Sequence, residues 1–420
     1  MDAIMQQKSR KKQKSNTIYL KSLFVAVLLV ALIALELTRN GSYLDEAVGI
    51  ASIPVILYYY KRIPSYELVT LAIMVVIVLI GVFSNLIFSI NSSLSSVFID
   101  IVSQTKLFLG FFGIRYALND TEKKAVTNYL LLPAKIFLLS AFVCAVVSIF
   151  VSIGMSGEVR YGLRTFNFIF DFNHQYTSVA FLCFGTIVRS EKMPQRVKSF
   201  YYVIGIVAIA LALKSPALMF SLIFVFFLFY FKRYERLSLK IIIPLLVALV
   251  LASRYQLQTY IMDKEATRRV FIDYAFVDAN EHFPLGSGFG TYGSAEAAKN
   301  YSPLYYEYGF HRRWGMSPNN SSFLFDTYWP CLLGQYGWFG FILNLILYYR
   351  WFVIIKNSQG EYDTQALLYA LFFQYLIHAL GAAILTSSAG LIGVLGLSLF
   401  CIPDREKIKN IKHQRIRLRI

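Results

Sequence analysis

The chain of 420 residues is 57% hydrophobic and 15% charged, with a mean hydropathy of +0.54. Because about a quarter of the residues of a soluble domain are charged, this composition excludes a soluble globular protein and indicates an integral membrane protein. The formal charge of +17 does not indicate nucleic-acid binding. The basic residues cluster at the chain ends and in short loops between apolar runs, where lipid headgroups and membrane topology account for them.

The chain begins with a basic arm, residues 1–18, that leads into an apolar run. No small-residue cleavage site follows this run, so we expect a retained first span and no cleaved signal peptide. A helix needs about 20 residues to cross a bilayer. Twelve segments are long enough and apolar enough to be expected spans: 19–38, 44–60, 66–90, 95–116, 127–152, 175–189, 198–213, 216–231, 240–256, 336–355, 365–384 and 387–402. The predicted fold class is therefore all-α and polytopic.

The charges indicate on which side of the membrane each loop lies. Both chain ends are basic, and so are the loops "YYKR", "DTEKK", "RSEKMPQRVK" and "KRYERLSLK", whereas "TRNGSY", "INSS" and "TSS" together hold one basic residue. This bias, with an even number of spans, predicts that both termini, including the basic tail 403–420, are cytoplasmic. The loop 153–174, within the first nine spans (19–256), then faces outward. The large loop 257–335, which precedes the last three spans (336–402), does so too.

One expected span carries polar residues that share a helical face. Asp100, Ser103 and Gln104 follow a three-to-four spacing in the segment 95–116, so this face should point into the helix bundle. Ionisable groups inside a membrane are candidates for function. A role in helix packing through hydrogen bonds is an equal alternative.

Basic residues in the first outer loop point to an anionic ligand. Arg160 and Arg164 are four residues apart, and Asn173 and His174 follow at the start of the next span. Guanidinium groups match phosphate oxygens in geometry and keep their charge, so these residues are candidate ligands of a lipid-linked diphosphate. Lys214 lies where the seventh span reaches the outer surface. It either extends its amine to the interface or binds an anion.

The large outer loop adds His311, Arg312 and Arg313. From Arg254 to Asp326 there are seven basic and eight acidic residues, so the alternative is that the arginines pair within the loop. The many tyrosines and tryptophans suit either stacking on sugar rings or burial against the bundle. The glycines of "PLGSGFGTYG" indicate tight turns more than a nucleotide-binding loop. Neither outer loop contains an Asp-x-Asp pair, so we expect no metal ion and no cofactor.

Two stretches resemble the family of O-antigen polymerases and O-antigen ligases. The segment "FPLGSGFGTYG", followed by "NNSSFLFDTYWPCLLGQYGWFGF", is similar to the family's glycine-rich element (284–290), its Asn-Ser element (319–321) and its G-x-x-G element (337–340). The stretch "RYGLRTFNFIFDFNHQYTSVAF" resembles the family's Arg…Pro-Asn element, with Arg160 or Arg164 as the arginine and Asn173 as the asparagine. "LALKSPALM", with Lys214 and Ser215, stands where the family has Ser-Arg-Ser/Thr.

Departures from the family pattern favour a polymerase over a ligase. Asn319 stands where ligases commonly have a histidine, and the proline before Asn173 and the arginine of the Ser-Arg element are missing. The resemblance implies a metal-independent glycosyltransferase in the bacterial inner membrane that joins undecaprenyl-diphosphate-linked oligosaccharide repeat units at the outer face. Membrane lipid and a polysaccharide chain-length regulator are the other implied partners. The alternatives are a ligase or a polysaccharide flippase, although no internal repeat indicates a transporter.

On this interpretation, basic and amide side chains bind the substrate and one side chain of the large loop acts as the base. The expected substrate-binding residues are Arg160, Arg164, Asn173, His174, Lys214, Arg312, Arg313 and Asn320. The candidates for the catalytic base are, in order, His311, Asp326 and Glu307. Spacing alone does not choose among these three.

Overall fold

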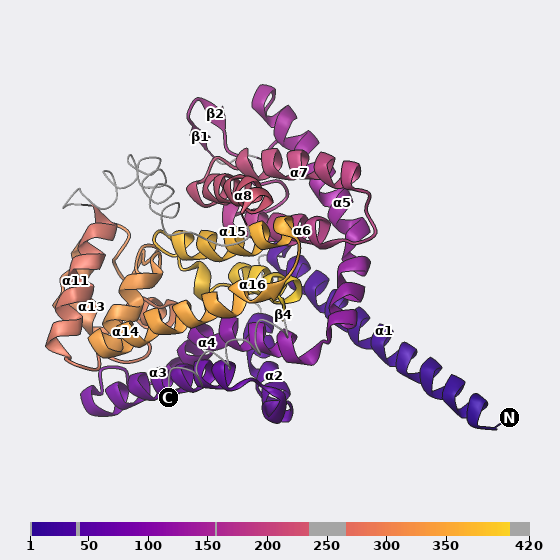
Figure 1. Ribbon diagram of the computed structural model, residues 1–420. Coiled ribbons are helices and arrows are strands. Elements are labelled where there is room, and N and C mark those ends of the chain that lie inside the picture. Colours follow the sequence, from indigo (N-terminus) through magenta and orange to yellow (C-terminus); the bar gives the residue numbers. More distant parts are fainter. Residues whose placement is uncertain (1, 39–42, 156–157, 235–265, 404–420) are drawn as a thin grey trace.

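A computed structural model describes residues 2–38, 43–155, 158–234 and 266–403 and is mostly helical (74%). The longer helices are α1 (Asp2–Leu37), α2 (Leu44–Tyr58), α3 (Ser65–Phe88), α4 (Leu94–Ala117), α5 (Asp120–Phe150), α6 (Asn173–Arg189), α7 (Gln195–Ala210), α8 (Ser215–Arg233), α11 (Thr267–Glu281), α14 (Tyr328–Lys356), α15 (Tyr362–His378) and α16 (Ser388–Phe400) (Figure 1). Short helices are α12 (Ala295–Lys299), α13 (Pro303–Glu307) and the 3-10 turns Tyr60–Arg62, Phe310–Arg312 and Ile384–Thr386. Two short antiparallel pairs complete the fold, β1 (Val159–Arg160) with β2 (Leu163–Arg164) and β3 (Ser358–Gln359) with β4 (Ile402–Pro403).

Six helices of the described part are long and apolar enough to cross a membrane: Tyr19–Leu37 of α1, then α3, α4, α5, α8 and α14. The prediction of a helical, polytopic membrane protein is confirmed at this level. Eleven of the twelve expected segments lie in helices, but α2, α6, α7, α15 and α16 have only 13 to 17 residues each. The expected span 240–256, the start of the large loop (257–265) and the tail 404–420 lie outside the described residues.

The centre of the bundle consists of three helix segments that are buried on all sides. These are 104–115 of α4, 176–188 of α6 and 389–400 of α16. α16 packs against both α4 and α6. A helix that is buried all round must lie at the centre.

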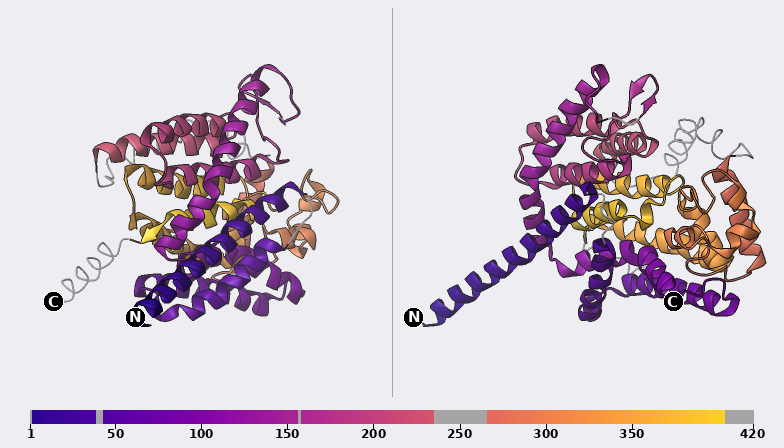
Figure 2. Two further views of the ribbon diagram at one scale, coloured as in Figure 1. Left: turned by 90° about the vertical axis from the view of Figure 1, so that its right-hand side faces the viewer. Right: turned by 180° about the vertical axis from the view of Figure 1, so that it is seen from behind.

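Helices α1, α3 and α5 instead expose large apolar side chains, among them Phe24, Phe83 and Leu132. Exposed apolar surface on this scale needs a nonaqueous neighbour, which lipid provides. The N-terminal part of α1 extends away from the bundle as a single helix, as seen in Figure 1 and in the right-hand view of Figure 2.

One buried group of charges joins α2 and α4. The amine of Lys106 on α4 contacts the carboxylates of Asp45 and Glu46 on α2, with a distance of 2.6 Å to Glu46 Oε1. All three side chains are largely withdrawn from solvent, at 2%, 6% and 17% exposed. Removing one partner of such a group is costly because an uncompensated charge remains buried.

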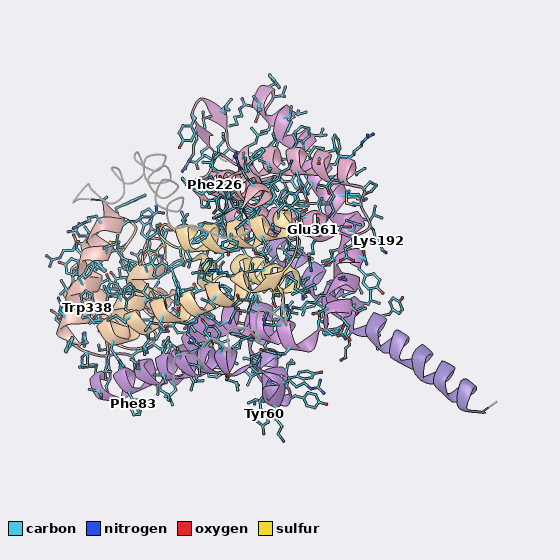
Figure 3. The ribbon with its side chains drawn as sticks, in the orientation of Figure 1. Tyr60, Phe83, Lys192, Phe226, Trp338 and Glu361 are labelled. Carbon is cyan, nitrogen blue, oxygen red and sulfur yellow. The ribbon has the colours of Figure 1, made fainter. Side chains whose placement is uncertain are left out.

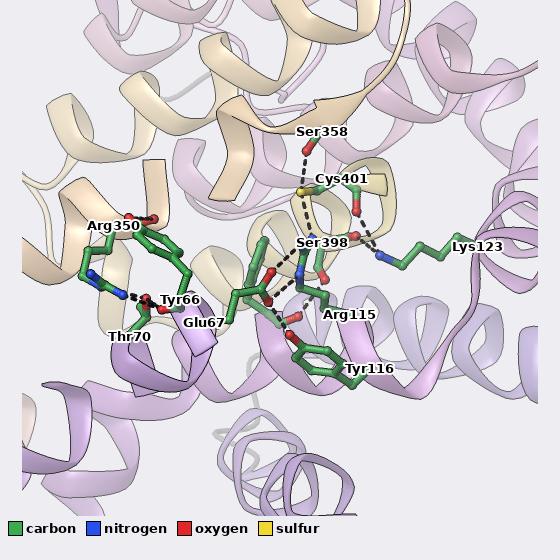
Figure 4. Close-up of polar contacts among 11 residues, drawn as sticks. Tyr66, Glu67, Thr70, Arg115, Tyr116, Lys123, Arg350, Ser358, Ser398 and Cys401 are labelled. Carbon is green, nitrogen blue, oxygen red and sulfur yellow. Dashed lines mark hydrogen bonds and ion pairs between the residues drawn. The ribbon is translucent and has the colours of Figure 1, made fainter. Parts of the chain in front are cut away.

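A second buried cluster ties the ends of α3, α4, α5 and α16 together (Figure 4). Arg115 binds both carboxylate oxygens of Glu67 at 2.8 Å, in the bidentate geometry that favours arginine. Lys123 donates to the main-chain oxygens of Ser398 and Cys401 at 2.9 and 3.0 Å. These carbonyls end helix α16, where a cation is favourable. The cluster thus closes the bundle at this end.

The polar stretch 267–327, called the polar segment below, lies at the other end. It contains α11, α12 and α13, and α11 packs against α14 (Figure 1). Trp338 of α14 donates from Nε1 to Asn280 Oδ1 of α11 at 2.8 Å. Figure 3 places Trp338 at this end of the molecule and Lys192 and Glu361 towards the opposite end. The bundle therefore has two chemically different ends.

Candidate functional site

The glycine-rich element is interlocked with a break in helix α14. The sequence places the start of this span at 336, but the helix begins already at Tyr328 and is interrupted at Gly337, whose φ is +60° and ψ −169°. The break leaves the carbonyls of Gly334 and Gln335 without their usual helical partners. The first accepts the N–H of Ser287 at 2.9 Å and the second that of Gly288 at 3.0 Å. The glycine-rich and G-x-x-G elements thus form one structural unit.

Polar side chains of α3 and α4 hold the same glycine-rich chain inside the bundle. Asp100 is 1% exposed and its Oδ2 accepts the N–H of Gly290 at 2.6 Å and an amide N–H of Gln335 at 2.7 Å. Asn85 binds both main-chain groups of Phe289, at 2.7 and 2.9 Å. Of the two alternatives for Asp100, these contacts support the role in helix packing. The glycines make turns here, as predicted.

Several aromatic side chains of the polar segment lie in a small core of its own. Tyr292, Tyr305 and Tyr308 are buried with Val270, Phe271, Ala275, Ala279, Ala297, Ala298, Leu304, Phe310, Met316, Leu324 and Leu333. Tyr306 and Trp314 point outward, at 54% and 78% exposed. Burial in the segment's own core therefore accounts for three tyrosines, and Tyr306 and Trp314 are among the aromatic rings that remain exposed.

The candidate cations of the first outer loop differ in how far they are paired. Arg160 and Lys214 share the carboxylate of Glu158, with Arg160 Nε at 3.1 Å from Oε1. The hydrogen bond from Lys214 is the main reason that the pKa of Glu158 lies below its usual value. Arg164 keeps an enclosed nitrogen, Nη1, that has no hydrogen-bond partner within the described residues. Among the described residues, Arg164 thus supplies the enclosed guanidinium nitrogen of this loop that has no partner.

Asn173 joins the first outer loop to the bundle, and His174 makes a local contact beside it. The amide of Asn173 donates to the main-chain oxygens of Phe166 at 3.2 Å and Ala212 at 3.3 Å, which joins the loop to the end of α7. The ring of His174 stacks on Phe172 with centroids 5.5 Å apart. The geometry gives Asn173 a structural role, which the sequence interpretation did not include.

The remaining candidates on the polar segment are mostly at its surface. Glu307, Arg312, Arg313 and Asn320 are exposed. Arg312 Nε donates to His311 Nε2 at 3.2 Å, so the lone pair of that nitrogen is directed at a cation. Nδ1 of His311 is enclosed and has no partner in the part of the chain that is described. His311 is consequently a poor base in this arrangement.

Asp326, the second candidate base, lies in an ion pair. Arg268 Nε donates to its Oδ2 at 2.9 Å and Nη2 to the same oxygen at 2.5 Å. Burial raises the pKa of Asp326, while Arg268 acts in the opposite direction. The internal pairing that the charge balance allowed is present for Arg268 and also for Arg269, which binds Asp273 at 2.9 Å. Asp326 is thus engaged by Arg268 and is not a free base.

The predicted site residues fall into two groups and not one. One group surrounds the β1–β2 hairpin near α5, α7 and α8, and the other lies on the polar segment beside α11 and α14 (Figures 1 and 2). Asp326 belongs to the second group and lies at the end of the polar segment, paired with Arg268. A substrate with two separated recognition elements would be needed to contact both groups.

A carboxylate–imidazole pair that the sequence interpretation missed lies at the end of α11. Asp278 Oδ1 is 2.9 Å from Nδ1 of His282, and Asp278 is fully buried. The spacing of four residues on a helix was visible in "DANEHF" and is the signal that could have revealed the pair. Its importance depends on Ser287 and Tyr308, which bind the same carboxylate from elsewhere in the chain.

No family model matches the sequence, and comparison with curated proteins gives no match.

Proposed function

We propose that this protein is a glycosyltransferase that joins undecaprenyl-diphosphate-linked oligosaccharide repeat units into a surface polysaccharide. The observation that carries the proposal is the polar segment: it is folded around its own core, fixed to the bundle through the glycine-rich element, and carries accessible arginines and aromatic rings. Such a fixed surface suits holding two substrates in register. The resemblance of the glycine-rich, Asn-Ser and G-x-x-G elements to O-antigen polymerases supports the same function.

The proposed topology has twelve spans in the bacterial inner membrane, with cytoplasmic termini and the polar segment in the periplasm. The positive-inside bias supports it, as does the position of Lys192, in a basic loop, away from the polar segment. Reporter fusions at Asn280 and Gln195 should report opposite sides of the membrane. Two cytoplasmic signals would overturn the topology and the function together.

The chemistry that this function needs is displacement at an anomeric carbon. A hydroxyl of the acceptor sugar attacks, and the diphosphate leaves with growing negative charge, which a guanidinium stabilises more in the transition state than in the ground state. Arg164 suits this role because leaving a buried charged donor unpaired is unfavourable, and its enclosed Nη1 lacks a partner among the described residues. An anionic oxygen of the substrate would satisfy it.

The test compares Arg164→Lys with Arg160→Lys in cells that lack the native gene. Lysine keeps the charge and loses the planar fork, and a charge-assisted hydrogen bond contributes about 1.5–3 kcal/mol, or roughly 10- to 100-fold in rate. Arg164→Lys should shorten or abolish the polymer ladder at a normal protein level. Arg160→Lys is the control, because lysine can still pair with Glu158, and its ladder should be close to that of the wild type.

Wild-type polymer from Arg164→Lys would refute the role of this arginine. The pattern of products in the gene deletion separates the two family activities. Loss of a polymerase leaves glycan of a single repeat unit, whereas loss of a ligase leaves long polymer on the lipid carrier. The second pattern would identify a ligase.

A further inference from the structure

The hydrogen bonds of His282 fix which ring nitrogen carries the proton. Nδ1 lies 2.9 Å from the carboxylate oxygen Oδ1 of Asp278 and 3.0 Å from the main-chain oxygen of the same residue. Both oxygens are acceptors, so Nδ1 must be the donor. In the neutral ring the lone pair is then on Nε2. Some side-chain nitrogens of the described residues are fully enclosed and have no hydrogen-bond partner, but Nε2 of His282 does not belong to them. The side chain of His282 is 13% exposed.

Asp278 is itself held rigidly from two further directions. Ser287 Oγ donates to Oδ2 at 2.7 Å, and the single proton of the Tyr308 hydroxyl lies within reach of two acceptors, Oδ1 of Asp278 at 3.2 Å and Oε2 of Glu281 at 3.0 Å. Burial raises the pKa of Asp278, and the hydrogen bonds from His282, Ser287 and Tyr308 act against that rise. This support fixes the carboxylate and, through it, the orientation of the imidazole.

The charges around His282 favour its protonated form. Burial by itself would lower the pKa of His282, but the hydrogen bond and charge of Asp278, with a further contribution from Glu281, raise it above its usual value. Both carboxylates are on α11. Tyr308, which directly follows α13, is the titratable group that approaches this pair from outside α11, and Phe88 of α3 contributes an uncharged ring.

The imidazole lies where the polar segment meets the lipid-exposed end of α3. Its ring makes an edge contact with Phe88, the last residue of α3, with centroids 4.7 Å apart. Leu86, Ile87 and Phe283 nearby in the chain are 70%, 61% and 68% exposed. An apolar surface of this kind suits the lipid part of a membrane-anchored molecule. The sugar attached to such a lipid would be presented at the level of His282.

We propose that His282 is the catalytic base that receives the proton of the acceptor sugar hydroxyl and that Asp278 is its positioning residue. This inference rests on the proposed glycosyl transfer. It replaces His311, Asp326 and Glu307 as the base. The substrate class at this site is a hydroxyl of a membrane-anchored oligosaccharide.

The step balances without a further reactant. As the acceptor oxygen forms its bond to the anomeric carbon of the donor, its proton passes to Nε2 of His282. The bond between that carbon and the phosphate oxygen breaks, and its electron pair leaves with the lipid diphosphate. The imidazolium that forms is stabilised by Asp278, and it returns its proton to water before the next cycle.

The decisive variant is His282→Asn, assayed with purified full-length protein and lipid-linked oligosaccharide extracted from cells lacking the gene. The asparagine amide can occupy the place of Nδ1 and still donate to Asp278, but it offers no base at the position of Nε2. A general base contributes about 10²–10⁴-fold, so polymer formation should fall at least about a hundredfold. If His282 only stabilises the fold, His282→Asn should retain activity while His282→Ala loses it. Activity of His282→Asn within tenfold of the wild type would overturn the proposal.

The pH profile tests the same proposal without a change in fold. Wild-type activity should decrease towards acid as His282 is protonated, and since its pKa is raised above 6.5, the rate at pH 5.5 should be at least about tenfold below that at pH 8. Asp278→Asn removes the charge that raises this pKa, so its acid limb should move to lower pH. A flat wild-type profile, or an unmoved limb in Asp278→Asn, would count against the base. If the wild type itself forms no polymer, the proposed function fails instead.

Discussion

Gly286→Ala tests whether the glycine-rich element holds the polar segment on the bundle. Gly286 has φ of +77°, and a Cβ at this position would collide with the main-chain nitrogen of Gly337 and the oxygen of Gly334. Neither obstacle is a flexible side chain, so the two chains must separate. Gly309 is the matched control: its φ is +70°, and a Cβ there meets no atom of the described chain within 4 Å.

The expected magnitude follows from two contributions. The left-handed conformation costs an alanine about 1 kcal/mol at either position. At Gly286 the separation also breaks the hydrogen bonds from Ser287 and Gly288 to α14, each contributing about 1 kcal/mol. The polar segment should therefore lose about 3 kcal/mol of local stability in Gly286→Ala, and about 1 kcal/mol in Gly309→Ala.

Hydrogen–deuterium exchange of helix α11 in the detergent-solubilised protein measures this difference. Exchange from a transiently open state follows the free energy of opening, so about 3 kcal/mol corresponds to roughly a hundredfold faster exchange and about 1 kcal/mol to roughly fivefold. Helix α16, at the centre of the bundle, should be unaffected in both variants. Equal exchange of α11 in Gly286→Ala and Gly309→Ala would refute the idea that close contact with α14 holds the segment in place.

Two further predictions concern charges inside the bundle, each measured as thermal stability in detergent. Asp100→Ala leaves the buried N–H of Gly290 without its acceptor and should cost about 2 kcal/mol; an unchanged melting temperature would contradict its role in helix packing. Lys106→Met leaves the two carboxylates of α2 without a cation and should cost about 3–5 kcal/mol. Lys124→Met, at an exposed ion pair, is its control and should change stability by less than about 0.5 kcal/mol. Equal losses of stability in the two lysine variants would contradict the idea that burial makes the Lys106 ion pair important for the fold.

Part of the site was predictable because its signals are local in the chain. The glycine-rich element and the G-x-x-G element each stood out in the sequence, and positive φ angles at Gly286, Gly288, Gly290 and Gly337 agree with the tight turns expected there. Their contact with one another was not predictable, since nothing in either pattern specifies a partner. The same limit applies to Lys214, which finds its carboxylate on a residue far away in the chain.

The choice of base shows the limit most clearly. His311 was placed first among the three candidates, but Arg312 donates to its Nε2 in the folded chain. His282 and Asp278 have a spacing that suits contact on a helix. That spacing alone does not distinguish an ordinary surface pair from one whose carboxylate is held by further hydrogen bonds. The support comes from Tyr308, which reaches Asp278 only because the polar segment folds back on α11.

The sequence by itself determined that the protein lies in a membrane and that it is built from helices. Hydrophobic runs and charge bias are properties of consecutive residues, and lipid imposes helices on them because each main-chain polar group must be satisfied within its own segment. Only the tertiary structure decided which polar residues serve the fold, such as Asp100 and Asn173, and which retain free hydrogen-bonding capacity, such as Arg164. The reason is that a polar group's availability depends on the partners brought to it from other parts of the chain, and those partners are set by how the helices pack.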